Sequence, residues 1–158
     1  MRHLLFACFC FALMTGCSSS EPVSPAKAPT KVTFSLVATE GMNPNVWGEA
    51  APVEIQVFEL VDDSMFMSSS YDQLKQDYKK ALKSNFIKSY DYVLLPGQFK
   101  FVNEIEVTDE TNYIGVLANF SDIELSEWKK AVKVIKQGRE YHLLMLLNDY
   151  EVDLQRVE

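Results

Sequence analysis

Hydrophobic and polar residues alternate with a period of two in several segments of this chain. Val32, Phe34 and Leu36 fall on one side of the first such segment, and polar residues fall on the other. The segment 53–58 repeats the pattern after a proline, except that Phe58 joins the polar side. Alternation of this kind predicts strands with one buried face, because successive side chains of a strand point to opposite faces.

Between residues 68 and 83 the apolar spacing changes to three and four. Tyr71, Leu74, Tyr78 and Leu82 form one stripe, with aspartates and lysines between them. This spacing predicts an amphipathic helix with a serine available as its N-cap. We interpret the stripe as core packing and assign no site to it.

Further strands are predicted in the rest of the chain, and turn residues such as Pro96-Gly97 separate them. Residues 113–120 are nearly all apolar, which fits a central strand buried on both faces, with Gly115 marking a bulge or close packing. Residues 129–135 fit a helix or a strand. Seven to eight short strands with one inserted helix predict a mainly β protein, a β-sandwich over residues 31–158. The predicted strands are 31–36, 53–58, 90–95, 99–107, 113–120, 141–147 and 150–157.

Residues 1–16 are typical of a bacterial lipoprotein signal peptide. After a basic start, the apolar run 4–14 is too short for a transmembrane helix, and two small residues then precede Cys17. The stretch LMTGC fits a lipobox, although Met14 stands where leucine is usual. We expect cleavage before Cys17 and a diacylglycerol on its sulfur; the alternative is an ordinary secretory signal with an incidental cysteine.

Residues 17–30 are expected to form the lipidated N-terminus and a flexible tether. The segment after Cys17 is rich in Ser, Pro and Ala and lacks apolar periodicity, so it cannot bury enough surface to order itself. Its root-mean-square span is roughly 20 Å at linker statistics. Ser18 follows the cysteine where an aspartate would favour the inner membrane of enteric-type bacteria, so we expect the outer membrane.

Charge and cysteine content narrow the function classes. Removing residues 1–16, which include Arg2, leaves 14 basic and 22 acidic residues and changes the formal net charge from −7 to −8. This balance argues against nucleic acid and against attachment to an anionic membrane by a polybasic patch. Cys8 and Cys10 leave with the signal peptide and Cys17 carries lipid, so no thiol remains for a disulfide, a metal or catalysis.

Catalytic chemistry is not indicated by the residues that remain. His142 is the single histidine after Cys17, and we interpret it as paired or solvated. The acidic pairs 62–63 and 109–110 fall at turns, where carboxylates serve capping and solubility more often than acid–base catalysis. The sequence has no zinc ligand cluster, phosphate loop or nucleophile elbow. We therefore expect no catalytic residue, no metal and no cofactor apart from the covalent lipid on Cys17.

An ordered set of short motifs after the lipobox resembles the type VI secretion lipoprotein family, TssJ, also called SciN or VasD. Each motif is weak alone, but together they cover nearly the whole predicted domain. Residues 49–51 (EAA) depart from the more basic and polar stretch of the family. The motifs are Asn43-Pro44-Asn45, Gly48, Pro52-Val53, Val57-Phe58-Glu59-Leu60, Phe66, Leu74, Leu95-Pro96-Gly97, Tyr113-Ile114-Gly115-Val116-Leu117-Ala118 and Trp128.

The resemblance implies a transthyretin-like β-sandwich with a small helical insertion. It also implies an anchor on the periplasmic face of the outer membrane, which binds the periplasmic C-terminal region of TssM and, through it, works with TssL. In the family the loop between the first two strands contacts TssM, which corresponds here to residues 40–51. The implied partner-binding residues are Asn43, Pro44, Asn45, Val46, Trp47, Gly48 and Glu49.

Two alternatives stay open at this stage. Trp47 lies in a loop otherwise rich in Gly, Asn and Pro, and it is either a lid over the core or an anchor for a partner. The second alternative concerns function, because a lipoprotein of this fold class can also carry a small ligand. A pocket of several hundred cubic ångströms lined by polar groups would favour that function, and a closed apolar core would favour an anchor.

Overall fold

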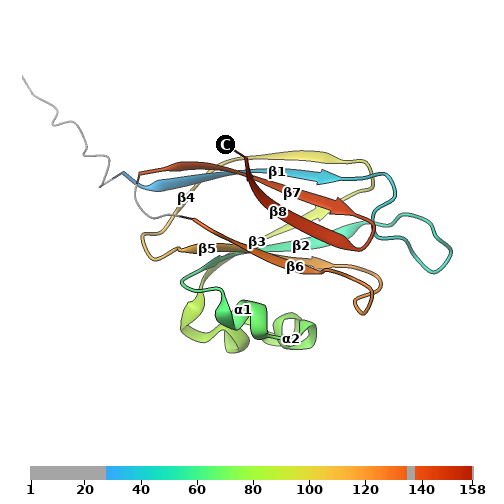
Figure 1. Cartoon of the computed structure of the whole chain (residues 1–158), viewed down its shortest axis with the longest axis horizontal. Coiled ribbons are helices and arrows are strands. Elements are labelled where there is room, and N and C mark those ends of the chain that lie inside the picture. Colours follow the sequence, from blue (N-terminus) through green and yellow to red (C-terminus); the bar gives the residue numbers. More distant parts are fainter. Residues whose placement is uncertain (1–27, 135–137, 158) are drawn as a thin grey trace, which may run out of the picture.

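The computed structural model describes residues 28–134 and 138–157, and it shows two four-stranded sheets packed face to face (Figure 1). The predicted mainly β sandwich is therefore confirmed. The predicted signal peptide, Cys17 and most of the tether lie outside the described residues. Within the described part of the chain, no helix has the length and apolar character needed to cross a membrane.

One sheet, called the β1 sheet here, has the strand order β4-β1-β7-β8. Its strands pair antiparallel except for β1 and β7, which run parallel. The β2 sheet has the order β3-β2-β5-β6 and is antiparallel throughout. The strands are β1 (Thr30–Ala38), β2 (Val53–Leu60), β3 (Phe86–Leu94), β4 (Phe99–Val107), β5 (Tyr113–Asn119), β6 (Lys129–Lys133), β7 (Glu140–Asn148) and β8 (Glu151–Val157). Lys129–Lys133 of the ambiguous segment 129–135 thus form a strand, and residue 135 lies outside the described residues.

The main core lies between the two sheets and follows the predicted alternation. Val32, Phe34 and Leu36 are at most 1% exposed, as are the alternate residues Val53 and Val57 of β2. The prediction for 113–120 also holds, because β5 is buried on both faces. Its outer face is covered by the helical insertion between β2 and β3.

That insertion consists of α1 (Ser64–Ser68), α2 (Tyr71–Leu82) and the short 3-10 helix η1 (Lys83–Asn85), packed on the outer face of the β2 sheet (Figure 1). Ser70 is the N-cap of α2 and forms a capping box with Gln73, as the predicted serine cap allows. Phe58, predicted on the polar side, is fully buried beneath these helices. The second apolar cluster contains Phe58, Leu60, Phe66, Leu74, Leu82 and Leu117.

Two residues of the β2 sheet, Gly115 and Lys129, allow the insertion to pack closely against it. A Cβ added to Gly115 of β5 would lie 3.1 Å from both Leu60 Cδ1 and Phe66 Cε1, so the predicted close packing at this glycine is confirmed. Lys129 Nζ donates to the backbone oxygens of Phe66, Met67 and Ser69 at 3.1, 2.7 and 2.6 Å. These contacts occupy carbonyls that the end of α1 leaves without intrahelical partners.

The two ends of the sandwich carry different parts of the chain. The loop pole, at the right of Figure 1, holds the β1–β2 loop, the β3–β4 turn, the segment after β5 and the β7–β8 turn. The tether pole is the opposite end, where Thr30 begins β1 and where β2 and β3 connect to the helices. Nine residues of β1 separate the two poles by about 30 Å at 3.3 Å per residue.

Candidate partner-binding loop

The β1–β2 loop crosses from one sheet to the other. The sequence predicted β1 and β2 as successive strands and did not place them in different sheets. Because the chain must pass from one sheet to the other, residues 39–52 are needed between the two strands. Met42 near its start is fully buried in the main core. The loop is therefore attached to the sandwich at its base and projects from the loop pole (Figure 1).

Asn43 joins three separate loops at this base. Its backbone N–H donates to the oxygen of Asp149 at 2.6 Å, and its Nδ2 donates to the oxygen of Pro52 at 2.9 Å. Its Oδ1 accepts the backbone N–H of Ser121 at 2.6 Å. The residue is 3% exposed and has a φ of 50°, a left-handed conformation in which asparagine is favoured. Asn43 therefore holds the loop and offers little of its own surface to a partner.

Pro44 extends the same clamp. Its carbonyl oxygen accepts hydrogen bonds from Ser121 Oγ at 2.9 Å and from the Tyr150 hydroxyl at 2.7 Å. Pro44 also forms an isolated antiparallel bridge with Ala50, which brings the two sides of the loop together. The base of the loop is thus tied to the segment after β5 and to the β7–β8 turn.

The tip of the loop is held by one side chain. Asn45 Oδ1 accepts the backbone N–H groups of Trp47 and Glu49 at 2.9 and 3.0 Å, and the Asn45 backbone oxygen accepts the Gly48 N–H at 2.8 Å. Gly48 has a φ of 78°, which side-chain-bearing residues rarely adopt. These bonds fix the backbone of the tip without any contact from outside the loop.

The fixed tip exposes two large apolar side chains, Val46 at 90% and Trp47 at 80%. The alternative that Trp47 is a lid over the core is therefore wrong. A rigid loop that exposes a tryptophan has the character of an interface hot spot, because little conformational entropy remains to be lost on binding. The remaining assignment, Trp47 as an anchor for a partner, stays a prediction.

Two further exposed leucines at the loop pole were missed by the sequence analysis as binding residues. Leu95, in the turn between β3 and β4, is 54% exposed, and Leu125, in the segment between β5 and β6, is 73% exposed. A leucine within an otherwise polar turn is the signal that could have found them. With Val46 and Trp47 they give this pole an apolar surface contributed by three connections.

The residues considered for catalysis have ordinary structural partners. His142 Nε2 lies 2.7 Å from Ser35 Oγ, so the predicted pairing is confirmed, and the described residues place no carboxylate within hydrogen-bond distance of this imidazole. Asp62 accepts the backbone N–H of Ser64 at 2.9 Å, and hydrogen bonds from Ser64 hold the pKa of Asp62 below its usual value. Within residues 28–134 and 138–157, no group of His, Cys, Asp and Glu could hold a metal.

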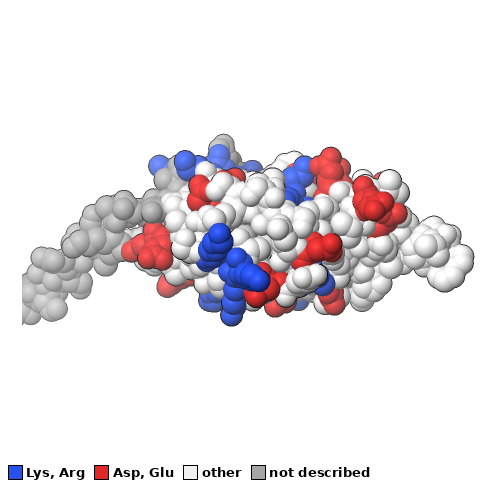
Figure 2. Space-filling model, turned by 90° about the horizontal axis from the view of Figure 1, so that it is seen from below, with Lys and Arg blue, Asp and Glu red and all other residues white. Residues whose placement is uncertain are grey.

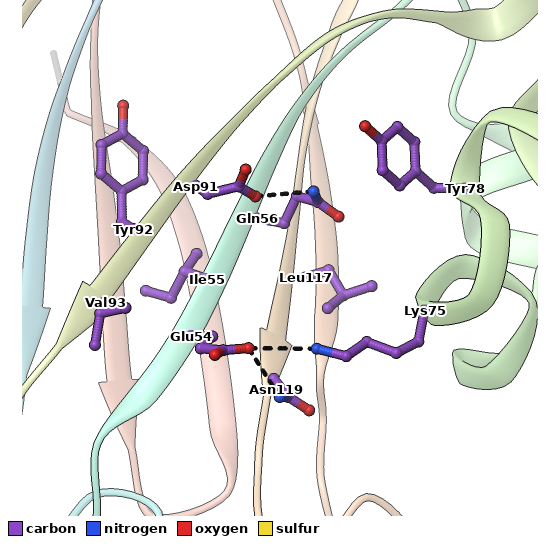
Figure 3. A pocket seen from close by; sticks show the side chains of 10 residues that line it. All are labelled: Glu54, Ile55, Gln56, Lys75, Tyr78, Asp91, Tyr92, Val93, Leu117 and Asn119. Atoms are coloured by element: carbon purple, nitrogen blue, oxygen red, sulfur yellow. Dashed lines mark hydrogen bonds and ion pairs between the residues drawn. The ribbon is translucent and has the colours of Figure 1, made fainter.

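A groove of about 410 Å³ lies on the outer face of the β2 sheet beside α2 (Figure 3). Its polar groups pair with one another: Gln56 Nε2 donates to Asp91 at 2.8 Å, and Glu54 accepts from Lys75 and Asn119, both at 3.3 Å. The size and polarity meet the condition that the sequence analysis set for a ligand carrier. The groove is a surface feature on the side of the sheet away from the main core.

Comparison with known proteins identifies the family. The model for the type VI secretion lipoproteins, described by the names VasD, EvfM and TssJ, matches residues 30–156. The chain belongs to the type VI secretion lipoprotein family. This confirms the resemblance drawn from the motifs, and it makes the protein a relative of structural components of the secretion machine. No curated protein sequence matches the chain.

Solved structures agree with that assignment. The crystal structure of the T6SS lipoprotein TssJ1 from Pseudomonas aeruginosa is 25% identical, with a TM-score of 0.79 over 83% of this chain and 98% of that chain. Serratia marcescens Lip, a membrane-bound component of the type VI secretion system, is 21% identical, with a TM-score of 0.70 over 83% and 98%. A chain from the structure of the TssM C-terminal domain from EAEC is 21% identical, with a TM-score of 0.68 over 80% and 98%. The last two show a shared fold.

Proposed function

We propose that this type VI secretion lipoprotein anchors the membrane complex to the outer membrane from the periplasmic face and binds the periplasmic C-terminal region of TssM through its β1–β2 loop. TssL would be reached only through TssM. The observation that carries the proposal is the exposed Trp47 on a tip whose backbone is already fixed by Asn45. Chains of this fold occur in the structures of the TssM C-terminal domain and of the type VI membrane complex, which supports a place for the protein in that complex.

The arrangement of the two poles supports the same role. A lipid on Cys17 would connect through the tether to Thr30 at one pole, and the candidate loop lies at the other, about 30 Å away. The domain can therefore hold its binding loop away from the headgroups and towards the periplasm. The residue after Cys17 is Ser18, which agrees with the outer membrane as the destination.

The contact residues divide into two roles in this proposal. Val46, Trp47, Gly48 and Glu49 are exposed and would touch TssM, whereas Asn43 is buried and would position them. Pro44 and Asn45 are partly exposed and shape the backbone of the tip. Leu95 and Leu125 on the neighbouring connections would extend the contact.

Trp47→Ala tests the proposal directly. Truncating an interface tryptophan commonly costs about 2 kcal/mol or more, which corresponds to a loss of affinity of roughly thirtyfold. We expect this loss for the periplasmic fragment of TssM, with an unchanged melting temperature because the side chain packs against no core residue. Phe101→Ala is the matched control, since Phe101 is an aromatic residue that is 51% exposed on β4, outside the loop. Equal TssM affinity for the wild-type protein and Trp47→Ala would refute the proposed interface.

The groove beside α2 favours a second candidate function, which is transport of a small polar ligand. Native mass spectrometry of the protein purified from its own cells would detect such a ligand as a discrete added mass. Gln56→Trp, which fills the groove, should abolish that added mass and leave TssM binding intact. Detection of the unliganded mass alone would count against this second function.

A further inference from the structure

The helical insertion carries a basic face on an otherwise acidic protein. Residues 71–85, which form α2 and η1, contain four lysines and two aspartates, a formal charge of 4 − 2 = +2. The rest of the chain then carries −7 − 2 = −9. Figure 2 shows a group of blue atoms near the middle of the face that the helices cover, with red atoms beside it and further blue atoms along the upper edge. The net charge of the whole chain is negative, so it does not indicate this basic face.

We propose that three lysines of this face, Lys79, Lys80 and Lys83, contact anionic phospholipid headgroups and set the orientation of the anchored domain on its membrane. This inference rests on the proposed function, because it takes the tether to be attached to lipid. The lipid would supply the attachment, and the lysines would supply the orientation.

The three ammonium groups form no ion pair with a described residue, although Lys79 Nζ lies over the Phe86 ring, 5.9 Å from its centroid. The ion pairs between described residues are Lys31–Glu104, Lys75–Glu54 and Lys130–Glu127, and none of them involves the three lysines. All three residues are exposed. Their charge is therefore available to a negatively charged surface, which attracts clustered lysines.

A hollow beside these lysines has room for a headgroup. Its volume is about 460 Å³, and Ser69, Gln73, Gln76, Lys80 and Lys83 supply hydroxyl, amide and ammonium donors along its wall. Asp77 is the one carboxylate that lines it. A lining rich in donors and cations fits a phosphodiester, whose oxygens are acceptors.

The position of the lysines brings them close to the membrane. The helix α2 runs toward the tether pole, because its first residue, Tyr71, donates to Asn119 near the loop pole and its last turn leads through η1 to Phe86. The lysines therefore lie at the end of the domain from which the tether leaves. A tether of roughly 20 Å would keep them within reach of the headgroups.

Acidic loops at the same pole specify which side of the domain makes the contact. Asp62 and Asp63 follow β2, and Asp109 and Glu110 lie between β4 and β5. Anionic headgroups repel Asp109 and Glu110 and attract the lysines, so the domain should tilt onto its helical side, where Asp62 and Asp63 next to α1 offset part of the attraction. The α2 dipole stabilises all three lysines in place, since Lys79 and Lys80 lie in the last turn and Lys83 is the C-cap.

Energy transfer on vesicles tests this orientation. The acylated full chain, with a fluorophore on Ser84→Cys beside Lys83, is placed in phosphatidylcholine vesicles with and without phosphatidylglycerol, together with a headgroup-labelled acceptor lipid. We expect phosphatidylglycerol to raise the transfer from this site. We expect the gain to be lost in 1 M salt, where the screening length is about 3 Å. The triple variant K79Q/K80Q/K83Q should also lose the gain.

The matched control is K100Q/K133Q/R156Q, which removes the same charge from strands outside the insertion and should keep the gain. Transfer that is independent of phosphatidylglycerol, or unchanged in the lysine variant, would overturn the proposal. The proposal would also be overturned if the lysine variant no longer joined the membrane complex while phosphatidylglycerol had no effect on the energy transfer. That result would indicate that the lysines bind an acidic protein surface instead. Flotation with phosphatidylcholine vesicles alone measures the lipid anchor separately, so its failure would count against the proposed function.

Discussion

Replacement of Asn43 tests whether one buried amide holds the base of the partner-binding loop. The side chain donates to the Pro52 oxygen at 2.9 Å and accepts the Ser121 N–H at 2.6 Å, and the residue has a φ of 50°. Each hydrogen bond contributes about 0.5–1.5 kcal/mol net. Placing alanine in the left-handed region costs roughly 1–2 kcal/mol more. Asn43→Ala should therefore lower the free energy of unfolding by about 2–5 kcal/mol.

Two measurements separate these contributions. Asn43→Gly removes the same hydrogen bonds but tolerates the positive φ, so in urea unfolding it should be more stable than Asn43→Ala by about 1–2 kcal/mol. Amide hydrogen exchange at Ser121 should accelerate in both variants, because its N–H loses the acceptor. Binding to TssM should weaken as well, since the tip would no longer be held in place.

The reasoning would be refuted by a specific result. If Asn43→Ala lies within about 0.5 kcal/mol of the wild-type protein, the change is no larger than that of an ordinary surface substitution. If the Ser121 amide also exchanges at the wild-type rate, the side chain does not clamp the loop. Asn43 would then be unimportant for the position of the tip.

Three other predictions follow from the structure. Gly115→Ala should destabilise the protein by about 1–3 kcal/mol in urea unfolding, because the added methyl group meets the Phe66 ring in a packed cluster; an unchanged midpoint would contradict this. Burial and the hydrogen bond to the Glu59 carboxylate raise the pKa of the Tyr90 hydroxyl above its unfolded value of about 10. The contribution of Tyr90 to the free energy of unfolding is therefore complete below about pH 10, and it is lost as the pH rises through the folded pKa. Tyr90→Phe should flatten this alkaline decline, and an identical decline in the variant would argue against the assignment. Cys17→Ser should release the protein from the outer-membrane fractions in which the wild-type chain is expected, and normal fractionation of the variant would exclude the lipid anchor.

Sequence patterns predicted the sandwich because its core residues repeat with the period of a strand. The alternate residues of β1 and the continuous apolar run of β5 needed no knowledge of their neighbours. The serine cap of α2 was equally local, since it depends on residues three positions apart. The short helix α1 was missed because five residues carry too little periodicity to distinguish a helix from a turn.

Phe58 and Trp47 show where local patterns are insufficient. Phe58 was predicted on the polar side of its strand and Trp47 was left as a lid or an anchor, yet Phe58 is fully buried and Trp47 is 80% exposed. Phe58 is buried because the insertion folds back over its own sheet. Trp47 is exposed because the loop that carries it projects beyond the pole. Each outcome depends on contacts between distant segments.

The sequence by itself indicated most of the strands and the expectation of a lipid at Cys17, because these depend on residues close together in the chain, and it indicated the family through the order of short motifs along the chain. Only the tertiary structure decided that Asn43 joins the loop to Ser121 and Asp149, and that Lys79, Lys80 and Lys83 lie toward the pole where β1 begins. Charge summed over the chain could not reveal the basic face, since most of the acidic residues lie outside residues 71–85. Contacts between segments far apart in the chain determine which side chains lie close together, and the order of residues alone does not give the distances between such segments.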